Sequence, residues 1–356
     1  MLQPRLHRYK NFIQFELADS ILWNNDYEFL NFTKIILDKF NKKQFNTIIF
    51  YGMGCSAIVA DILKSFFISE NLLINIIILN DYHVEYLIDI ENYISQSTLF
   101  IITSYSGRTQ EPLLFFKKIK KITNNIIFLT SGGQILQIAC KENIPTIRLQ
   151  LRKPDPEYPL FHVPQFLSIL LNVFFNLHFI KSNYINQFRI INKKMRNVDK
   201  ANSLKHFEYF SKKLRDSEII LIANPKWYLA LLKLIKMHFN EVAMASAHRN
   251  YFHEFTHSEI ALLSDPKQKI SILLFHELSD DKLTNKKIVT IMKLFNKKYS
   301  KNINIELFEF EIQAKNFLEE FLITLQKFYY YTYFLGRYND TINRDLIYNA
   351  AVYTLK

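Results

Sequence analysis

The chain has 356 residues with a formal net charge of +12, and 49% of its residues are hydrophobic. This length suits two domains, and so apolar a composition excludes a disordered chain. The excess of Lys and Arg comes without a basic block, a zinc pattern or an aromatic RNA-binding motif, so no nucleic-acid partner is predicted. The net positive charge would still favour the binding of an anionic small molecule.

The first half of the chain alternates short apolar runs with helical patterns. An amphipathic helix is expected first, over 24–42. Strands are expected after it at 46–51, 72–79, 97–104, 125–131 and 145–150, with helices at 52–67, 105–121 and 132–140. Apolar β-branched runs that alternate with helices predict βαβ units, and therefore an α/β fold built on a mainly parallel sheet.

Four of the nine prolines lie between Pro154 and Pro164 and mark a boundary. Helical patterns continue to about Lys213, and a second α/β cycle then begins without glycine loops. We expect a strand at 217–224, a helix at 226–247, strands near 259–263, 269–275 and 303–310, a helix at 280–297 and two closing helices. The predicted organisation is a first domain over 1–152, a Pro-rich boundary with connecting helices over 153–213, and a second domain over 214–356.

Localisation is predicted from three features of the sequence. The two cysteines form no CxxC pair, which favours a reducing compartment. The first residues contain no apolar leader, and the most apolar stretch, 166–180, is shorter than the roughly 20 residues that span a bilayer. We therefore expect a cytoplasmic protein with no membrane segment.

Glycine is concentrated in three loops that each follow a predicted strand. Five of the six glycines lie there: Gly52 and Gly54, then Gly107, then Gly132 and Gly133. Glycine permits positive φ and close backbone approach, and the helix that follows each loop begins with free N–H groups. The loops predict a phosphate site. The first is neither a dinucleotide fingerprint, because its third glycine is missing, nor a P-loop.

The second loop, SYSGRT, carries three hydroxyls at the start of a helix: Ser104, Ser106 and Thr109. Ser56 stands at the start of another helix on the same predicted sheet edge. Hydroxyls and backbone N–H groups form a neutral cradle that suits a phosphate monoester. The simpler interpretation is helix capping by Ser106 or Thr109, with Glu111 in the first turn.

The three loop segments together resemble a known family. GMGCSAIVADIL (52–63), SYSGRTQEPL (104–113) and LTSGGQILQIACKENIP (129–145) resemble the successive loops of a sugar isomerase (SIS) domain. Their order in tandem halves is similar to the bifunctional phosphoglucose/phosphomannose isomerase family. NEVAMASAHRNYFHEFTHSEIAL (240–262) resembles that family's NEN…ELNHNEI segment, and the likeness covers roughly 45–355.

The resemblance implies two tandem SIS domains in a homodimer. It also implies interconversion of glucose 6-phosphate or mannose 6-phosphate with fructose 6-phosphate, without a metal or cofactor. Glu241 would move a proton between C1 and C2 through a cis-enediol, and His257 would assist ring opening, on the neighbouring subunit's substrate if the site lies at the interface. The residues implied at the phosphate are Ser56, Ser104, Ser106 and Thr109, with Gly54 and Gly107 in their loops.

The residue chemistry agrees with these implied roles. Aldose–ketose isomerisation needs a carboxylate near the carbons and an acid/base group near the ring oxygen. Glu241 comes late in an apolar helical pattern, where burial would raise its pKa as a base requires. The simpler interpretations are a solvated helix residue and a loop histidine. The spacing of His248, His253 and His257 is a weak metal pattern, and no metal is expected.

Three departures from the family pattern bear on activity. Cys55, Ala57, Val59 and Ala60 occupy positions where the family favours glycine. Glu157 falls near the position of a family arginine that would stabilise enediolate charge, and Arg152 is the nearest substitute. In NDTINRDLIYNA, Thr341 is retained while Ala350 replaces a family lysine, with Arg344 as a local cation. A non-catalytic sugar-phosphate-binding regulator and an aminosugar-phosphate isomerase therefore stay open as alternatives.

Overall fold

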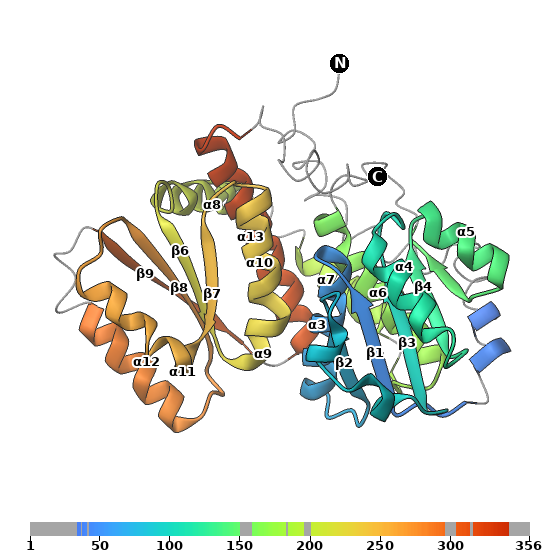
Figure 1. Cartoon of the computed structure of the whole chain (residues 1–356). Coiled ribbons are helices and arrows are strands. Elements are labelled where there is room, and N and C mark those ends of the chain that lie inside the picture. The colour runs from blue at the N-terminus through green and yellow to red at the C-terminus, as the bar shows by residue number, and fades with distance from the viewer. Residues whose placement is uncertain are drawn as a thin grey trace, which may run out of the picture. The chain divides into compact units, whose positions relative to one another are not determined.

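The computed structural model describes residues 34–36, 38–40, 43–149, 159–182, 184–195, 201–295, 304–313 and 316–341. They divide into two compact units between Asn192 and Lys193 (Figure 1), inside the predicted connecting segment 153–213. Residues 34–36 and 38–40 are helical. The rest of the helix expected over 24–42 lies outside the described residues, as does the second closing helix.

The first unit contains a sheet of five parallel strands. They are β1 (Thr47–Gly52), β2 (Asn75–Leu79), β3 (Thr98–Thr103), β4 (Ile126–Thr130) and β5 (Thr146–Arg148). Their spatial order is β2-β1-β3-β4-β5. Every neighbouring pair is parallel. Ile48 of β1 lies between Ile76 of β2 and Leu99 of β3, and Thr103 of β3 lies beside Leu129 of β4. The predicted parallel sheet is confirmed.

Helices cover both faces of this sheet. They are α3 (Cys55–Ser69), α4 (Gln110–Ile119), α5 (Gly133–Glu142) and α6 (Val163–Asn176), followed by α7 (Ile185–Met195). α4 covers one face, where Phe116 packs edge-on against Phe128 with ring centroids 4.8 Å apart. α6 covers the other face, where Phe174 lies 6.5 Å from Phe50. The apolar alternation of the strands therefore fills two cores.

The second unit repeats this plan with four parallel strands in the order β7-β6-β8-β9. The strands are β6 (Glu218–Ala223), β7 (Ala247–Tyr251), β8 (Ile270–Glu277) and β9 (Ile305–Ile312). The helices are α8 (Ala201–Lys213), α9 (Pro225–Trp227), α10 (Lys233–Glu241), α11 (Phe252–Phe255), α12 (Lys282–Leu294) and α13 (Phe317–Tyr338). Short 3₁₀ turns complete both units at 84–86, 90–93, 159–162 and 259–264.

The faces of the second sheet are also both covered. On one face, α11 and α12 join the strands in an apolar core that includes Phe252, Ile272 and Ile288. On the other face, Phe328 of α13 lies 5.3 Å from Phe275. Figure 1 shows the two helical layers on either side of β6 and β8.

Two predicted elements of the second unit are wrong. The helix expected over 226–247 ends at Glu241, because Met244 adopts φ 48°, a left-handed conformation that a helix cannot contain. The strand expected near 259–263 is a 3₁₀ helix over Glu259–Ser264. The missing strand is β7, whose sequence AHRNY is largely polar because it lies at the edge of the sheet.

A π-helical turn over Tyr228–Leu232 joins α9 to α10. A side chain of the edge strand β7 holds the first residue of this turn. The guanidinium of Arg249 donates a hydrogen bond of 2.7 Å to the Tyr228 carbonyl and lies 4.0 Å from the centre of the Tyr228 ring. π turns inside α-helices are rare and often occur near functional residues; this one lies on the helix that ends at Glu241.

Candidate functional site

The first sheet reverses its strand order between β1 and β3, because β2 lies on one side of β1 and β3 on the other. Open α/β sheets bind ligands at such a reversal, outside the carboxyl ends of the strands. The loop that follows β1 contains Gly54 and Ser56, and the loop that follows β3 contains the hydroxyls of SYSGRT. The structure therefore brings the first two predicted loops to one place.

Glycine is required at two positions in these loops. Gly54 adopts φ 53°, which side chains disfavour, and a Cβ there would meet nothing within 4 Å. Gly107 adopts φ 62°, and a Cβ would lie 1.8 Å from the Gly132 carbonyl oxygen. The space above Gly54 can admit a ligand, whereas Gly107 is needed because the second and third loops touch.

Hydrogen bonds fix the predicted hydroxyls. Ser56 Oγ accepts from the Tyr105 N–H at 3.0 Å, which ties the first loop to the second. Ser104, only 2% exposed, donates to Thr109 Oγ1 at 3.3 Å. Ser106 Oγ accepts from the Arg108 N–H at 3.3 Å. These bonds orient the side chains before any ligand arrives, which lowers the entropic cost of binding.

The simpler capping interpretation does not describe these helix starts. Thr109 is the N-cap of α4, yet its side chain makes no capping hydrogen bond. The N-cap of α3 is Gly54, which has no side chain. Neither N-cap residue therefore caps its helix through a side chain, which suits an anion-binding position.

The third loop supports the second. Ser131 donates to the Tyr105 carbonyl twice, from its backbone N–H at 2.8 Å and from Oγ at 2.6 Å. The Ile135 N–H donates to the Gly107 carbonyl at 3.1 Å. The third loop therefore holds the backbone of SYSGRT.

The cations near this edge are arginines. Arg108 belongs to the second loop and is exposed, and Arg148 ends β5 at the same sheet edge. Arg152 and Glu157, on which the expected charge stabilisation depends, lie outside the described residues. So do Arg344 and Ala350.

Glu241 is the half-buried last residue of α10. The segment that follows it is fastened to the end of α13. Asn339 Nδ2 donates to the Ala243 carbonyl at 3.0 Å, and Thr341 Oγ1 donates to the Val242 carbonyl at 3.2 Å. Thr341 is 1% exposed, so its hydroxyl serves this attachment. Sequence reasoning named Thr341 for the site but missed Asn339, which follows a long helix where a polar C-terminal residue is common.

His257 is exposed in the turn after α11, and its backbone N–H bonds to the Glu254 carbonyl at 3.0 Å. Glu241 comes before β7 in the chain and His257 comes after it. The five residues of this strand span roughly 16 Å.

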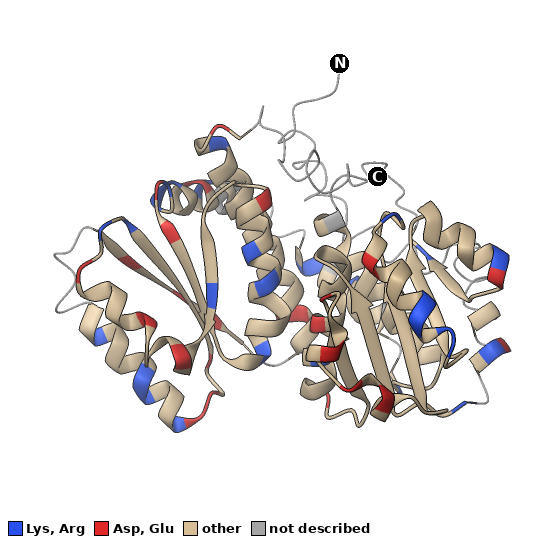
Figure 2. Ribbon diagram, in the orientation of Figure 1, with Lys and Arg blue, Asp and Glu red and all other residues tan. Residues whose placement is uncertain are grey.

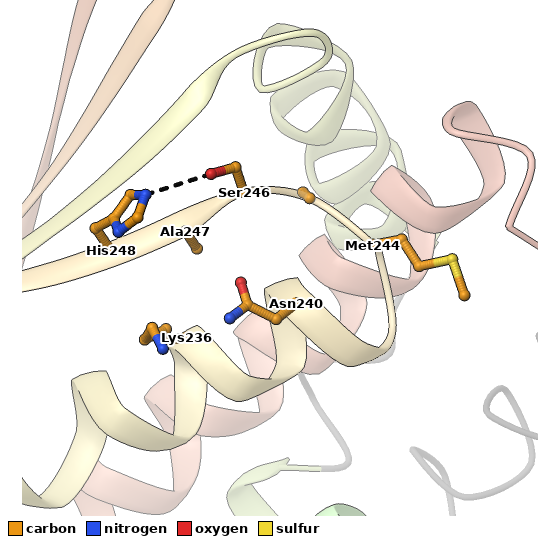
Figure 3. A pocket seen from close by; sticks show the side chains of 7 residues that line it. Lys236, Asn240, Met244, Ser246, Ala247 and His248 are labelled. Carbon is orange, nitrogen blue, oxygen red and sulfur yellow. Dashed lines mark hydrogen bonds between the residues drawn. The ribbon is translucent and has the colours of Figure 1, made fainter. Parts of the chain in front are cut away.

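A polar hollow of about 430 Å³ lies beside the end of α10. Figure 3 shows Lys236 and Asn240 on the helix facing His248 on the adjoining strand and Ser246 just before that strand. His248 also lies 3.4 Å from Glu218. The C-terminal end of a helix carries partial negative charge, and the cation of Lys236 offsets that charge near the end of α10.

Other expectations concern metals, thiols and charge. Cys55 and Cys140 are not joined in a disulfide bond. Among the described residues no three His, Cys, Asp or Glu side chains gather as metal ligands would, and no helix is long and apolar enough to cross a membrane. Lys and Arg are scattered among Asp and Glu along both units (Figure 2).

Comparison with known proteins identifies relatives along most of the chain. Residues 207–341 match the family model described as the bacterial phospho-glucose isomerase C-terminal SIS domain. The chain is 24% identical to the bifunctional phosphoglucose/phosphomannose isomerase of Thermoplasma volcanium, over 72% of this chain and 76% of the relative. It is 23% identical to the enzyme of that name from Thermoplasma acidophilum, over 89% and 91%.

Solved structures share the fold. A putative tagatose-6-phosphate ketose/aldose isomerase from Clostridium novyi aligns with a TM-score of 0.65 at 18% identity, covering 95% of this chain and 93% of that one. The C-terminal domain of a glucosamine-fructose-6-phosphate aminotransferase from Francisella tularensis aligns with a TM-score of 0.65 at 12% identity, covering 94% and 96%. The predicted α/β fold with tandem SIS domains is confirmed, as is the family resemblance.

Proposed function

We propose that this chain, which resembles the bifunctional phosphoglucose/phosphomannose isomerase family over most of its length, is a phosphosugar isomerase. The observation that carries the proposal is the strand reversal of the first sheet. Two helix N-termini without side-chain caps, the open space at Gly54 and the oriented serines meet there. We propose glucose 6-phosphate or mannose 6-phosphate as substrate and fructose 6-phosphate as product.

The phosphate is held by hydroxyls and backbone N–H groups rather than by a metal. We assign this role to Ser56, Ser104, Ser106 and Thr109. Because these groups are mostly neutral, they contribute direction and hydrogen bonds, while the net positive charge of the chain attracts the anion. Ser104 is buried and needs a polar partner, and Thr109 supplies it in the absence of ligand.

The chemical step moves one proton between neighbouring carbons. The Glu241 carboxylate removes the proton from C2 of the open-chain aldose, and electrons move onto the carbonyl oxygen to give a cis-enediolate, which becomes the cis-enediol when O1 takes a proton. Glu241 then returns its proton to C1 while the O2 hydroxyl gives up its own proton and becomes the carbonyl at C2, so no atom is gained or lost. His257 acts earlier, by proton transfer at the ring oxygen.

We propose that the working enzyme is a homodimer. In one chain β7, a strand roughly 16 Å long, lies between the segments that carry Glu241 and His257. In this proposal both residues act on one substrate because the histidine comes from a second chain. Mixing Glu241→Gln with His257→Ala chains would test this, because a mixed dimer would regain one complete site and a fraction of the activity. If the mixture stays as inactive as each variant alone, the shared site is wrong.

The activity test compares wild type with Glu241→Gln. We expect wild type to form fructose 6-phosphate from glucose 6-phosphate and mannose 6-phosphate, and the variant to lose roughly 10²–10⁴-fold in kcat while it still binds sugar phosphate. Equal rates would show that Glu241 is not the base. Binding without turnover by wild type would favour the regulatory alternative, and turnover of glucosamine 6-phosphate alone would favour the aminosugar isomerase.

A further inference from the structure

The second sheet also reverses its strand order, between β6 and β8. A ligand position is expected there by the same rule that locates one in the first sheet. Asn224 follows β6 and begins α9, while Glu277 is the last residue of β8. The side chains that meet at this reversal therefore decide whether a ligand can bind there.

The carboxylate of Glu277 occupies the reversal. It is 6% exposed, and both of its oxygens accept hydrogen bonds. Oε1 accepts from Lys226 Nζ at 2.6 Å and from the indole N–H of Trp227, and Oε2 accepts from Ser279 Oγ at 2.9 Å. A cation, an indole and a hydroxyl are donors that would suit a small carboxylate or phosphate ligand.

The surrounding groups fix these donors in place. Asn224 Oδ1 accepts from the Trp227 N–H at 3.2 Å, and its Nδ2 donates to Asp280 at 2.8 Å. The other oxygen of Asp280 accepts from the Glu277 N–H at 2.8 Å. The ammonium of Lys226 also lies 4.8 Å from the centre of the Trp227 ring. These contacts fix the backbone that carries Trp227 and Glu277 and place Lys226 against the indole ring.

We propose that the strand reversal of the second sheet is a carboxylate-binding site that the chain fills with its own Glu277. An external anion finds the donors taken and meets the repulsion of Glu277. The second unit therefore offers no position to a sugar phosphate, a consequence that rests on the proposed function, whereas the occupied carboxylate site does not.

The test replaces the attached carboxylate with a free one. Glu277→Ala should lower the melting temperature by roughly 5–15 °C, because it leaves Lys226 as a poorly solvated cation without this partner. Acetate or formate should recover about 3–5 °C at tenfold its dissociation constant. Acetamide, which has the same shape without the charge, should recover nothing, nor should chloride at the same ionic strength.

Matched variants keep the test decisive. Glu309→Ala removes a carboxylate that lies 2.8 Å from His276 on the neighbouring strands, and its melting should not respond to acetate. Glu277→Ala combined with Lys226→Met should also lose the response. If Glu277→Ala does not fold, Glu277→Gln retains the size of the side chain and should melt below wild type. A Gln variant as stable as wild type, or an Ala variant indifferent to acetate, would overturn the proposal.

A binding titration separates this proposal from the proposed function. Wild type should bind one glucose 6-phosphate per chain, and Ser279→Ala should leave that stoichiometry unchanged. Two equivalents per wild-type chain would show that the second reversal is open. If no sugar phosphate binds, the proposed function fails, while recovery of Glu277→Ala by acetate would still establish the carboxylate site.

Discussion

The two units differ in how the helices that follow the strands at each reversal are capped. After β1 and β3, α3 and α4 begin at Gly54 and Thr109 without a side-chain cap. After β6 and β8, Asn224 caps α9 through the Trp227 N–H, and Asp281 caps α12 at 2.8 and 3.1 Å. The N-cap side chains therefore bond to helix N–H groups in the second unit and not in the first.

This difference shows that the fold alone does not create a site. Both sheets are parallel, both contain a reversal of strand order, and both are covered by helices. A phosphate position requires donors that no internal group has taken. In the first unit glycine and short hydroxyl side chains leave that room, whereas in the second the longer side chains of Lys226 and Glu277 fill it.

The largest expected effect comes from closing the first reversal. Gly107→Ala forces a Cβ to within 1.8 Å of the Gly132 carbonyl oxygen, in a backbone with φ 62°. The loops must separate, and sugar-phosphate affinity should fall by at least ~100-fold as several bonds to the phosphate are lost. Asn143→Ala is the control, since Asn143 also has positive φ (53°) but ends α5. Isothermal titration should show unchanged affinity for that control; equal losses would point to general destabilisation.

A smaller effect on sugar-phosphate affinity is expected when equivalent hydroxyls of the two units are removed. Ser106→Ala should weaken sugar-phosphate binding by ~10-fold, because one hydrogen bond to a charged oxygen is lost. Ser279→Ala removes a hydroxyl that bonds to Glu277 instead, so affinity should not change. Dissociation constants measured for both variants would decide this. A loss in Ser279→Ala as large as that in Ser106→Ala would contradict the assignment of the ligand to the first unit.

The attachment after Glu241 should affect turnover more than binding. Asn339→Ala removes the donor to the Ala243 carbonyl, and kcat should fall about fivefold, the equivalent of one hydrogen bond near 1 kcal/mol. Thr341→Ser keeps its hydroxyl and should match wild type. Steady-state kinetics and titration on the same samples separate the two quantities. If Asn339→Ala weakens binding and leaves kcat intact, the positioning role is wrong.

The smallest effect concerns the capped helix of the second unit. Asp281→Ala should lower the melting temperature by about 2–4 °C without changing sugar-phosphate affinity. Hydrogen bonds from Thr284 hold the pKa of Asp281 below its ordinary value. Its stabilisation is therefore present above the ordinary aspartate pKa and is lost as pH falls through the folded-state pKa. The melting difference should disappear in acid; a difference that grows in acid would contradict the cap.

The buried strands could be predicted from sequence because each is a short apolar run. β7 could not, since an edge strand with exposed residues such as His248 lacks that signal. The run EIALL resembles a strand, yet Leu262 is 64% exposed while Leu263 is 1% exposed, as a tight helical turn allows. The helix formers Ala243, Met244 and Ala245 extended the predicted helix past its end, where hydrogen bonds from Asn339 and Thr341, just after α13, hold the chain.

The first-sheet site could be predicted because its residues form contiguous loops with few functional interpretations. The internal carboxylate of the second sheet could not, because Lys226 and Glu277 are far apart in sequence and each resembles an ordinary surface charge. Asn339 was missed for the same reason. Its role depends on a contact with Ala243, which sequence spacing does not reveal.

The π turn over Tyr228–Leu232 determines the direction of Glu241. Successive helical residues are about 100° apart around the axis, so one residue inserted upstream rotates every later side chain by that angle. Deleting one residue from the turn would restore a regular helix and aim position 241 elsewhere.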